Sequence, residues 1–245
     1  MTELLTSQKN VIIIEVHGNI GAGKRQFIEC LKYQLTYKLQ RYDFFIVEEP
    51  LDEITPLLKN YYNLHIGGLA IQSLISTYFY SKLYHIYRSL NERYSLAEHK
   101  PTVIIIERGI SAVQNVFVPV MKRLRYLDRS QVIIINDMIQ TYLRILDSQE
   151  SVLRSNGVSI TRYRLYINTP LMKCLANIAS RKRTGEQYIS IEYIGVCDTL
   201  HQEWIKNDIS FCVSNSARDA LSHFTRLIPG SDRELQYFDI CPPYL

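Results

Sequence analysis

The amino-acid sequence predicts an α/β fold, in which a parallel sheet of about five strands is covered by helices on both faces. Short runs of branched apolar residues recur along the chain without polar alternation, which is typical of strands buried on both faces. Segments with helical periodicity separate these runs, and a glycine-rich turn follows the first of them. The predicted strands are residues 11–16, 44–47, 103–106, 164–167 and 209–213.

The predicted helices lie between these strands and show apolar residues three or four positions apart. Ser130 is the predicted N-cap of a long helix, and a proline is expected in the first turn of the helix that begins at Pro170. The predicted helical segments are residues 27–39, 54–94 with a break at 67–68, 111–155 with a break at 128–130, 170–181, 189–205 and 219–227; residues 239–245 are expected to be an irregular tail.

The turn after the first strand matches the pattern G-x-x-x-x-G-K and predicts a phosphate-binding loop. Glycines let the backbone direct its N–H groups inward, and the lysine reaches the outer phosphates. The residues are Gly18, Asn19, Ile20, Gly21, Ala22, Gly23 and Lys24. The next position usually carries a serine or threonine that binds magnesium, but here it is Arg25. The alternative is a glycine-containing turn in an unrelated α/β domain.

Length and composition favour one domain over residues 1–245, with 47% hydrophobic residues to build its core. A net charge of +4 without a long basic block does not call for a nucleic-acid partner. The five cysteines are scattered, without metal-ligand spacing. Neither a signal peptide nor an apolar run long enough to span a bilayer is visible. We therefore expect a cytoplasmic protein that does not bind membranes.

Charged motifs follow two of the predicted strands. Residues 48–50 read Glu-Glu-Pro, and residues 107–109 read Glu-Arg-Gly. Ligands of parallel sheets bind beyond the carboxyl ends of the strands, where the glycine-rich turn also lies. The sequence therefore predicts one site that combines these motifs with the phosphate-binding loop.

In this order, the motifs resemble those of the deoxynucleoside kinase family over roughly residues 11–204. The landmarks are the loop at 18–24, Glu49-Pro50, Ile71-Gln72-Ser73, Glu107-Arg108, Arg181-Lys182-Arg183 with Glu186, and a helix containing Tyr193, His201, Glu203 and Trp204. The resemblance implies a three-layer P-loop kinase fold, an arginine-rich lid at about residues 181–188, ATP and Mg²⁺ as cosubstrate and cofactor, and a homodimer built on the helices within 111–155.

The resemblance assigns catalytic roles to residues of this chain. Glu49 would be the general base for the nucleoside 5′-hydroxyl, and Glu107 would bind magnesium through water. Arg108 would steady the phosphate region, and Arg181 and Arg183 would neutralise the transferred phosphoryl group. Alternatives remain, because Glu49 could be a helix-capping acid and the lid arginines an ordinary solvated helix C-terminus.

The resemblance also assigns the nucleoside-binding residues. Gln72 would pair with the base, while Tyr62 and Glu186 would hold the sugar 3′-hydroxyl. The residues that would line the base pocket are Ile75, Phe79, Val113 and Phe117. In family members that accept cytosine and purines, an arginine and an aspartate stand near two of these positions, so we expect thymidine or a pyrimidine range here. Each assignment has a structural alternative: Tyr62 could be a surface tyrosine, Gln72 an ordinary helix glutamine, and the four apolar residues part of the core.

Three positions depart from the family pattern: His17 replaces a glutamate, Arg25 a hydroxyl residue and Gly109 a serine. The first functional hypothesis is an active deoxynucleoside kinase in nucleotide salvage. The second is a kinase-like binding or structural subunit with impaired catalysis, which Arg25 favours. The third is another P-loop phosphotransferase, such as a nucleoside monophosphate kinase.

Overall fold

The computed structural model describes residues 9–38, 42–95, 100–215, 219–220 and 224, with backbone alone at 34–38. The end of the helix expected at 27–39, most of that expected at 219–227 and the tail at 239–245 lie outside these residues. The described strands form one parallel sheet in the order β2-β3-β1-β4-β5, which confirms the predicted fold class. They are β1 (Asn10–His17), β2 (Asp43–Val47), β3 (Thr102–Glu107), β4 (Ser159–Ile167) and β5 (Phe211–Ser214).

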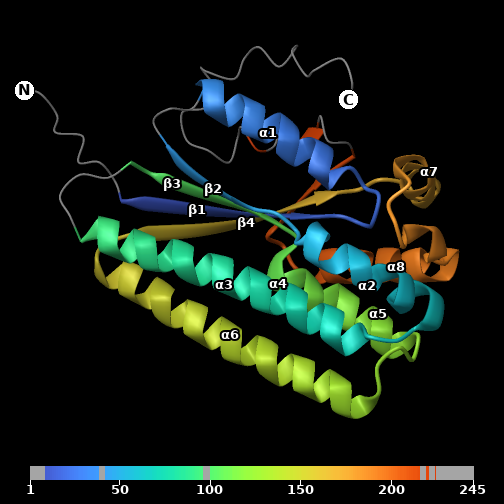
Figure 1. Cartoon of the computed structure of the whole chain (residues 1–245). Coiled ribbons are helices and arrows are strands. Elements are labelled where there is room, and N and C mark those ends of the chain that lie inside the picture. The colour runs from blue at the N-terminus through green and yellow to red at the C-terminus, as the bar shows by residue number, and fades with distance from the viewer. Residues whose placement is uncertain (1–8, 39–41, 96–99, 216–218, 221–223, 225–245) are drawn as a thin grey trace, which may run out of the picture.

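Helices cover both faces of the sheet, as Figure 1 shows. Helix α1 lies on one face, while α3 and α6 run side by side across the other, and α7 stands beyond the carboxyl ends of the strands (Figure 1). The α-helices are α1 (Lys24–Lys38), α2 (Leu51–Leu64), α3 (Gly68–Tyr94), α4 (Gly109–Ala112), α5 (Val118–Arg123), α6 (Arg129–Ser155), α7 (Leu171–Arg181) and α8 (Ile191–Asn207).

The central strand β1 contributes to two hydrophobic clusters. Ile12 and Ile14 pack with Phe27 on the α1 side, whereas Val11 and Ile13 belong to the larger cluster on the α3 side. All four β1 residues are at most 6% exposed, which explains the unbroken apolar run in the sequence. Burial on both faces fixes β1 firmly and so fixes the origin of the loop that follows it.

Several predicted boundaries were wrong. Helix α1 begins at Lys24 rather than 27, because the end of the glycine-rich turn already forms its first turn. Asp128, not Ser130, caps α6: its carboxylate accepts from the Gln131 N–H at 2.8 Å, and the Gln131 side chain accepts from the Asp128 N–H at 3.0 Å. Pro170 is the N-cap of α7 rather than its first helical residue.

The helix expected at 111–127 is interrupted. Residues Val113–Phe117 form a π-helical turn between α4 and α5. Such a turn carries an extra residue, a local feature that apolar periodicity does not reveal. None of the helices in the described ranges is long and apolar enough to cross a bilayer.

Candidate active site

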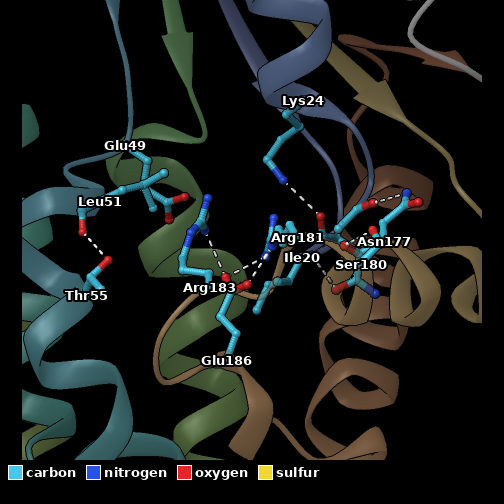
Figure 2. A network of polar contacts seen from close by, with 12 residues as sticks. Ile20, Lys24, Glu49, Leu51, Thr55, Asn177, Ser180, Arg181, Arg183 and Glu186 are labelled. Atoms are coloured by element: carbon cyan, nitrogen blue, oxygen red, sulfur yellow. Dashed lines mark hydrogen bonds and ion pairs between the residues drawn. The ribbon is translucent and has the colours of Figure 1, made fainter. Parts of the chain in front are cut away.

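The glycine loop (residues 18–24) joins β1 to α1 at the carboxyl edge of the sheet. Gly21 and Gly23 have φ values of +81° and +93°, which side-chain-bearing residues rarely adopt. A Cβ on Gly21 would lie 2.4 Å from the carbonyl oxygen of Cys174 in α7. The Lys24 Nζ donates to the carbonyl oxygens of Gly18 and Asn19, each at 2.9 Å (Figure 2). The loop therefore curls around its own lysine and packs tightly against α7.

Two side chains beyond the loop, Asn177 and Thr169, hold it from outside, and sequence reasoning missed them. The Asn177 Nδ2 donates to the Gly21 carbonyl at 2.8 Å, and the Thr169 Oγ1 donates to the Ala22 carbonyl at 2.9 Å. On the other side, the Asn19 Nδ2 donates to the Ile194 carbonyl of α8 at 3.1 Å. The only signal in the sequence is a polar asparagine on the inner side of the amphipathic helix α7.

A cleft of about 560 Å³ opens beside the loop and brings the predicted charged residues together. Figure 2 shows Lys24, Glu49, Arg181, Arg183 and Glu186 around it. The predicted residues in its wall are Ile20, Gly21, Ala22, Gly23, Lys24, Arg25, Glu49, Tyr62, Glu107, Arg108, Arg181, Arg183 and Glu186. The two strand-end motifs and the arginine-rich segment thus meet at one place, although they are far apart in sequence.

Glu49 and Arg108 form a buried ion pair. The Arg108 Nη1 donates to the Glu49 Oε1 at 2.5 Å, and the two side chains are 8% and 11% exposed. Burial raises the pKa of Glu49, but the positive charges of Arg108 and Lys24 outweigh this and lower it, so the carboxylate is ionised. Burial and the nearby Glu49 charge raise the pKa of Glu107.

The arginine segment (residues 181–188) is held together by ion pairs between its own residues. The Arg181 Nε and Nη2 donate to the two carboxylate oxygens of Glu186, both at 2.5 Å, and the Arg183 Nη1 donates to its Oε1 at 2.9 Å (Figure 2). The glutamate is 5% exposed. Gly185 seats the segment on α2, because a Cβ there would lie 2.7 Å from the Leu58 Cβ. In this structure the Glu186 carboxylate is therefore paired with Arg181 and Arg183.

A second, smaller cavity of about 40 Å³ adjoins the cleft. Its wall includes Gln72 and all four predicted base-pocket residues, Ile75, Phe79, Val113 and Phe117, together with Tyr61 and Tyr193, which were not predicted. This volume is close to that of one water molecule, so the cavity in this conformation is too small for a nucleobase. Two buried polar atoms in its wall, the Gln72 Oε1 and the Arg108 Nε, have no hydrogen-bond partner within the described structure.

Glu15 organises a polar network beneath the strand-end motifs. Its Oε2 accepts from the Arg164 Nε at 3.0 Å and from the His17 Nε2 at 3.3 Å. The Ser111 Oγ lies 3.0 Å from the same oxygen and 3.3 Å from the carbonyl oxygen of Arg108. Arg108 itself has a φ of +68°, an unusual conformation for a residue with a side chain. The network therefore supports a strained turn that carries a central arginine.

Two departures seen in the sequence have structural counterparts here. His17 hydrogen-bonds to Glu15, and Gly109 has a φ of +74°, where a Cβ would also lie 3.1 Å from the Ile106 Cγ2. Sequence reasoning noticed these two positions but missed Glu15 and Ser111. A detectable signal was a glutamate inside an otherwise apolar, doubly buried strand.

The carboxylates of Glu49 and Glu107 face the cleft, and Mg²⁺ is commonly held by one or two carboxylates together with substrate phosphates. A cage of three or more acidic, histidine or cysteine ligands is absent from the residues that the structure describes. Arg25 offers no acceptor atom, so it cannot be a metal ligand. The residues present fit a metal bound through Glu107 and phosphate, without a ligand from position 25.

Comparison with known proteins gives the family. Residues 14–236 match the deoxynucleoside kinase family model. The chain belongs to the deoxynucleoside kinase family. The resemblance inferred from the motifs is thereby confirmed, and members of this family are phosphotransferases.

Individual relatives are distant. Human mitochondrial thymidine kinase 2 is 22% identical over 204 residues, which cover 81% of this chain and 65% of that protein's length. Deoxyadenosine kinase from M. mycoides with bound dCTP has a TM-score of 0.61 at 21% identity, covering 88% of this chain and 98% of the other. Its complex with dATP gives 0.57 at 20% identity, covering 87% and 98%. These structures confirm the fold.

Proposed function

We propose that the protein transfers the γ-phosphoryl group of ATP to the 5′-hydroxyl of a deoxynucleoside. The supporting observation is the junction between the cleft and the small cavity: Glu49 and Arg108 line both. The Gln72 Oε1 and Arg108 Nε are buried there without partners in the described structure, and an unsatisfied buried polar atom is costly unless a ligand pairs with it. A nucleoside with its base in the cavity and its 5′-hydroxyl at Glu49 would supply both partners.

On the donor side, the glycine loop and Lys24 would bind the triphosphate in the cleft. Magnesium held by Glu107 through water would neutralise charge between the β- and γ-phosphates. Lys24 is already placed at the loop centre, where it would exchange backbone carbonyls for phosphate oxygens. The loop is thus preorganised, because its curvature is fixed by α7 rather than by the ligand.

On the acceptor side, the ionised Glu49 would accept the 5′-hydroxyl proton. Arg108, now paired with Glu49, would hold the incoming hydroxyl and phosphoryl oxygens. Residues 181–188 would act as a lid, with Arg181 and Arg183 moving from Glu186 to the transferred group. Glu186 would then be free for the sugar 3′-hydroxyl, together with Tyr62. Phosphoryl transfer needs mainly positioning and charge stabilisation, which this arrangement supplies.

The small cavity supports a pyrimidine preference. Ile75, Phe79, Val113 and Phe117 bring apolar bulk to its wall, and Gln72 supplies an amide that donates and accepts. Widening a cavity of this size for a six-membered ring requires less movement than for a purine. Phosphorylation of free nucleosides would give the protein a role in nucleotide salvage. We expect thymidine or deoxycytidine to be the better acceptor.

The test is phosphoryl transfer from ATP to each of the four deoxynucleosides. We expect turnover with a pyrimidine and at least a hundredfold loss in Glu49→Gln, because removal of a general base typically costs 10²–10⁴-fold. ATP binding should survive in this variant. Glu192→Gln, at an exposed site at the start of α8, is the matched control. Absence of turnover with all four nucleosides at high enzyme concentration would refute the proposal.

We further propose a homodimer through α6. Ile133 and Ile134 near its start are 50% and 54% exposed, and Val152 near its end is 44% exposed. The family resemblance supplies the expectation of a dimer, and these exposed apolar residues are where α6 would contact its partner helix. Sedimentation should give a dimer for the wild type and a monomer for the double variant Ile133→Glu, Ile134→Glu. A monomeric wild type would contradict this part of the proposal.

The second candidate, a kinase-like binding subunit with impaired catalysis, is favoured by Arg25. If it is correct, the wild type binds nucleosides without turnover and Arg25→Ser gains activity. Turnover by the wild type excludes it.

A further inference from the structure

Arg25 lies between two spaces of different charge. It is an exposed residue in the first turn of α1 and lines the cleft beside the glycine loop. It also lines an adjoining groove of about 180 Å³. The acidic residues of that groove are Glu48, Glu49, Asp52, Glu53 and Glu107.

The cations of the cleft differ in how they are satisfied. Arg108 is paired with Glu49, and Arg181 and Arg183 are paired with Glu186. Lys24 donates to backbone carbonyls, and neither it nor Arg25 forms an ion pair with any described residue. Lys24 and Arg25 are therefore the two cations of the cleft that form no salt bridge with a described carboxylate, and they are adjacent at the start of α1.

Position 25 also has a chemical constraint. A guanidinium has five N–H donors and no acceptor, so it cannot ligate a metal ion, and it repels one placed close by. Its planar fork matches two phosphate oxygens at once, and such charge-assisted bonds are about twice as strong as neutral ones. The group best suited to pair with Arg25 in this cleft is a phosphate rather than a metal.

Building on the proposed function, we propose that Arg25 binds the donor phosphates directly, so that the protein binds nucleoside triphosphate without a divalent cation. Arg25, together with Lys24 in its protonated form, then carries the neutralisation that elsewhere requires a metal bridged to a loop hydroxyl. Magnesium at Glu107 contributes to transfer but is not needed for donor binding.

The test is calorimetric titration of ATP into wild type, Arg25→Ser and Arg25→Lys, each with excess EDTA and with Mg²⁺. We expect the wild-type Kd to change less than about threefold between the two conditions. Arg25→Ser should bind at least about tenfold more weakly in EDTA and recover with Mg²⁺, because serine restores a metal-binding hydroxyl. Arg25→Lys should fall between them, since lysine keeps the charge without the fork.

Arg123→Ser, at an exposed arginine at the end of α5, is the matched control and should bind like the wild type. Loss of wild-type ATP binding in EDTA would overturn the inference, as would equal wild-type and Arg25→Ser affinities in EDTA. Either result leaves the proposed function standing if ATP still binds with Mg²⁺. No ATP binding under any condition by a folded wild type would refute both.

Discussion

Replacement of Glu15 by glutamine tests the network beneath the active-site turn. The substitution keeps the side-chain shape but removes the charge that Arg164 faces at 3.0 Å. It also leaves Ser111 without its anionic acceptor. Arg164 keeps a second partner, because its Nη1 donates to the Asp208 carboxylate at 2.5 Å, so the expected cost is the loss of the interactions that Glu15 itself makes.

The expected magnitude follows from the pKa of Glu15. Burial alone would raise it, but the hydrogen bond and charge of His17, followed by the charges of Arg164 and Arg162, lower it from 4.5 to about 2. A carboxyl with a lower pKa in the folded state stabilises the fold above its unfolded pKa. That contribution disappears as the pH falls through the folded value. The shift corresponds to at most about 3 kcal/mol at pH 7, because burial lowers the pKa of His17 and leaves it uncharged there, and to about 2 kcal/mol at pH 3.5.

Urea unfolding of wild type and Glu15→Gln between pH 7 and pH 3.5 measures this directly. The difference in unfolding free energy should be between about 1 and 3 kcal/mol at pH 7 and should shrink as the pH falls below about 4. Glu203→Gln, at an exposed site on α8, should show neither the loss nor the pH dependence. A difference below about 1 kcal/mol at pH 7, or one that stays constant to pH 3.5, would show that Glu15 does not have this role.

Three further predictions concern the loop and the turn. Burial and the charge of Arg108 lower the pKa of Lys24 to about 7 in the free protein. Because phosphate favours the ammonium form, ATP affinity should fall from pH 6 to pH 8. ATP binding at pH 8 should also take up a proton, which calorimetry detects as a binding heat that depends on the buffer. Gly21→Ala places a Cβ 2.4 Å from the Cys174 carbonyl oxygen and should weaken ATP binding more than about tenfold. Gly195→Ala is the control, because a Cβ there meets nothing within 4 Å, and it should bind ATP like the wild type. Equal titration curves for the two variants would refute the tight contact. Ser111→Ala should lower kcat about tenfold at unchanged KM for ATP, and Ser111→Thr should restore kcat. An unchanged kcat in steady-state kinetics of Ser111→Ala would show that the Arg108 turn does not need this hydroxyl.

The sheet was predictable because its strands carry a local signal. The apolar runs at 11–16, 44–47 and 103–106 each lie within one residue of the observed strand ends. Strand β4 was predicted five residues too short, since its first half carries Thr161 and Arg162. An arginine is tolerated in this strand because Arg162 pairs with Glu150 of α6. Such a contact between distant segments cannot be predicted from a local sequence pattern.

The residues of the site were predictable or not for the same reason. Glu49, Glu107 and Arg108 could be placed because they follow strands, and parallel strands end at one edge. The support of the loop by Asn177 could not, because it depends on how α7 packs. The pairing of Glu186 with the arginines could not be predicted either, because it depends on how residues 181–188 fold back at the end of α7.

Under the proposed function, that pairing makes Glu186 an intramolecular competitor of the ligand. Its carboxylate is only five residues from Arg181 and three from Arg183, so it is present at a high effective concentration. The two guanidinium groups are held in place by this carboxylate, so a phosphate would not have to order them. In return, a phosphate that pairs with the arginines would have to displace Glu186. Binding would then exchange one anion for another, and the return of the Glu186 carboxylate would favour product release.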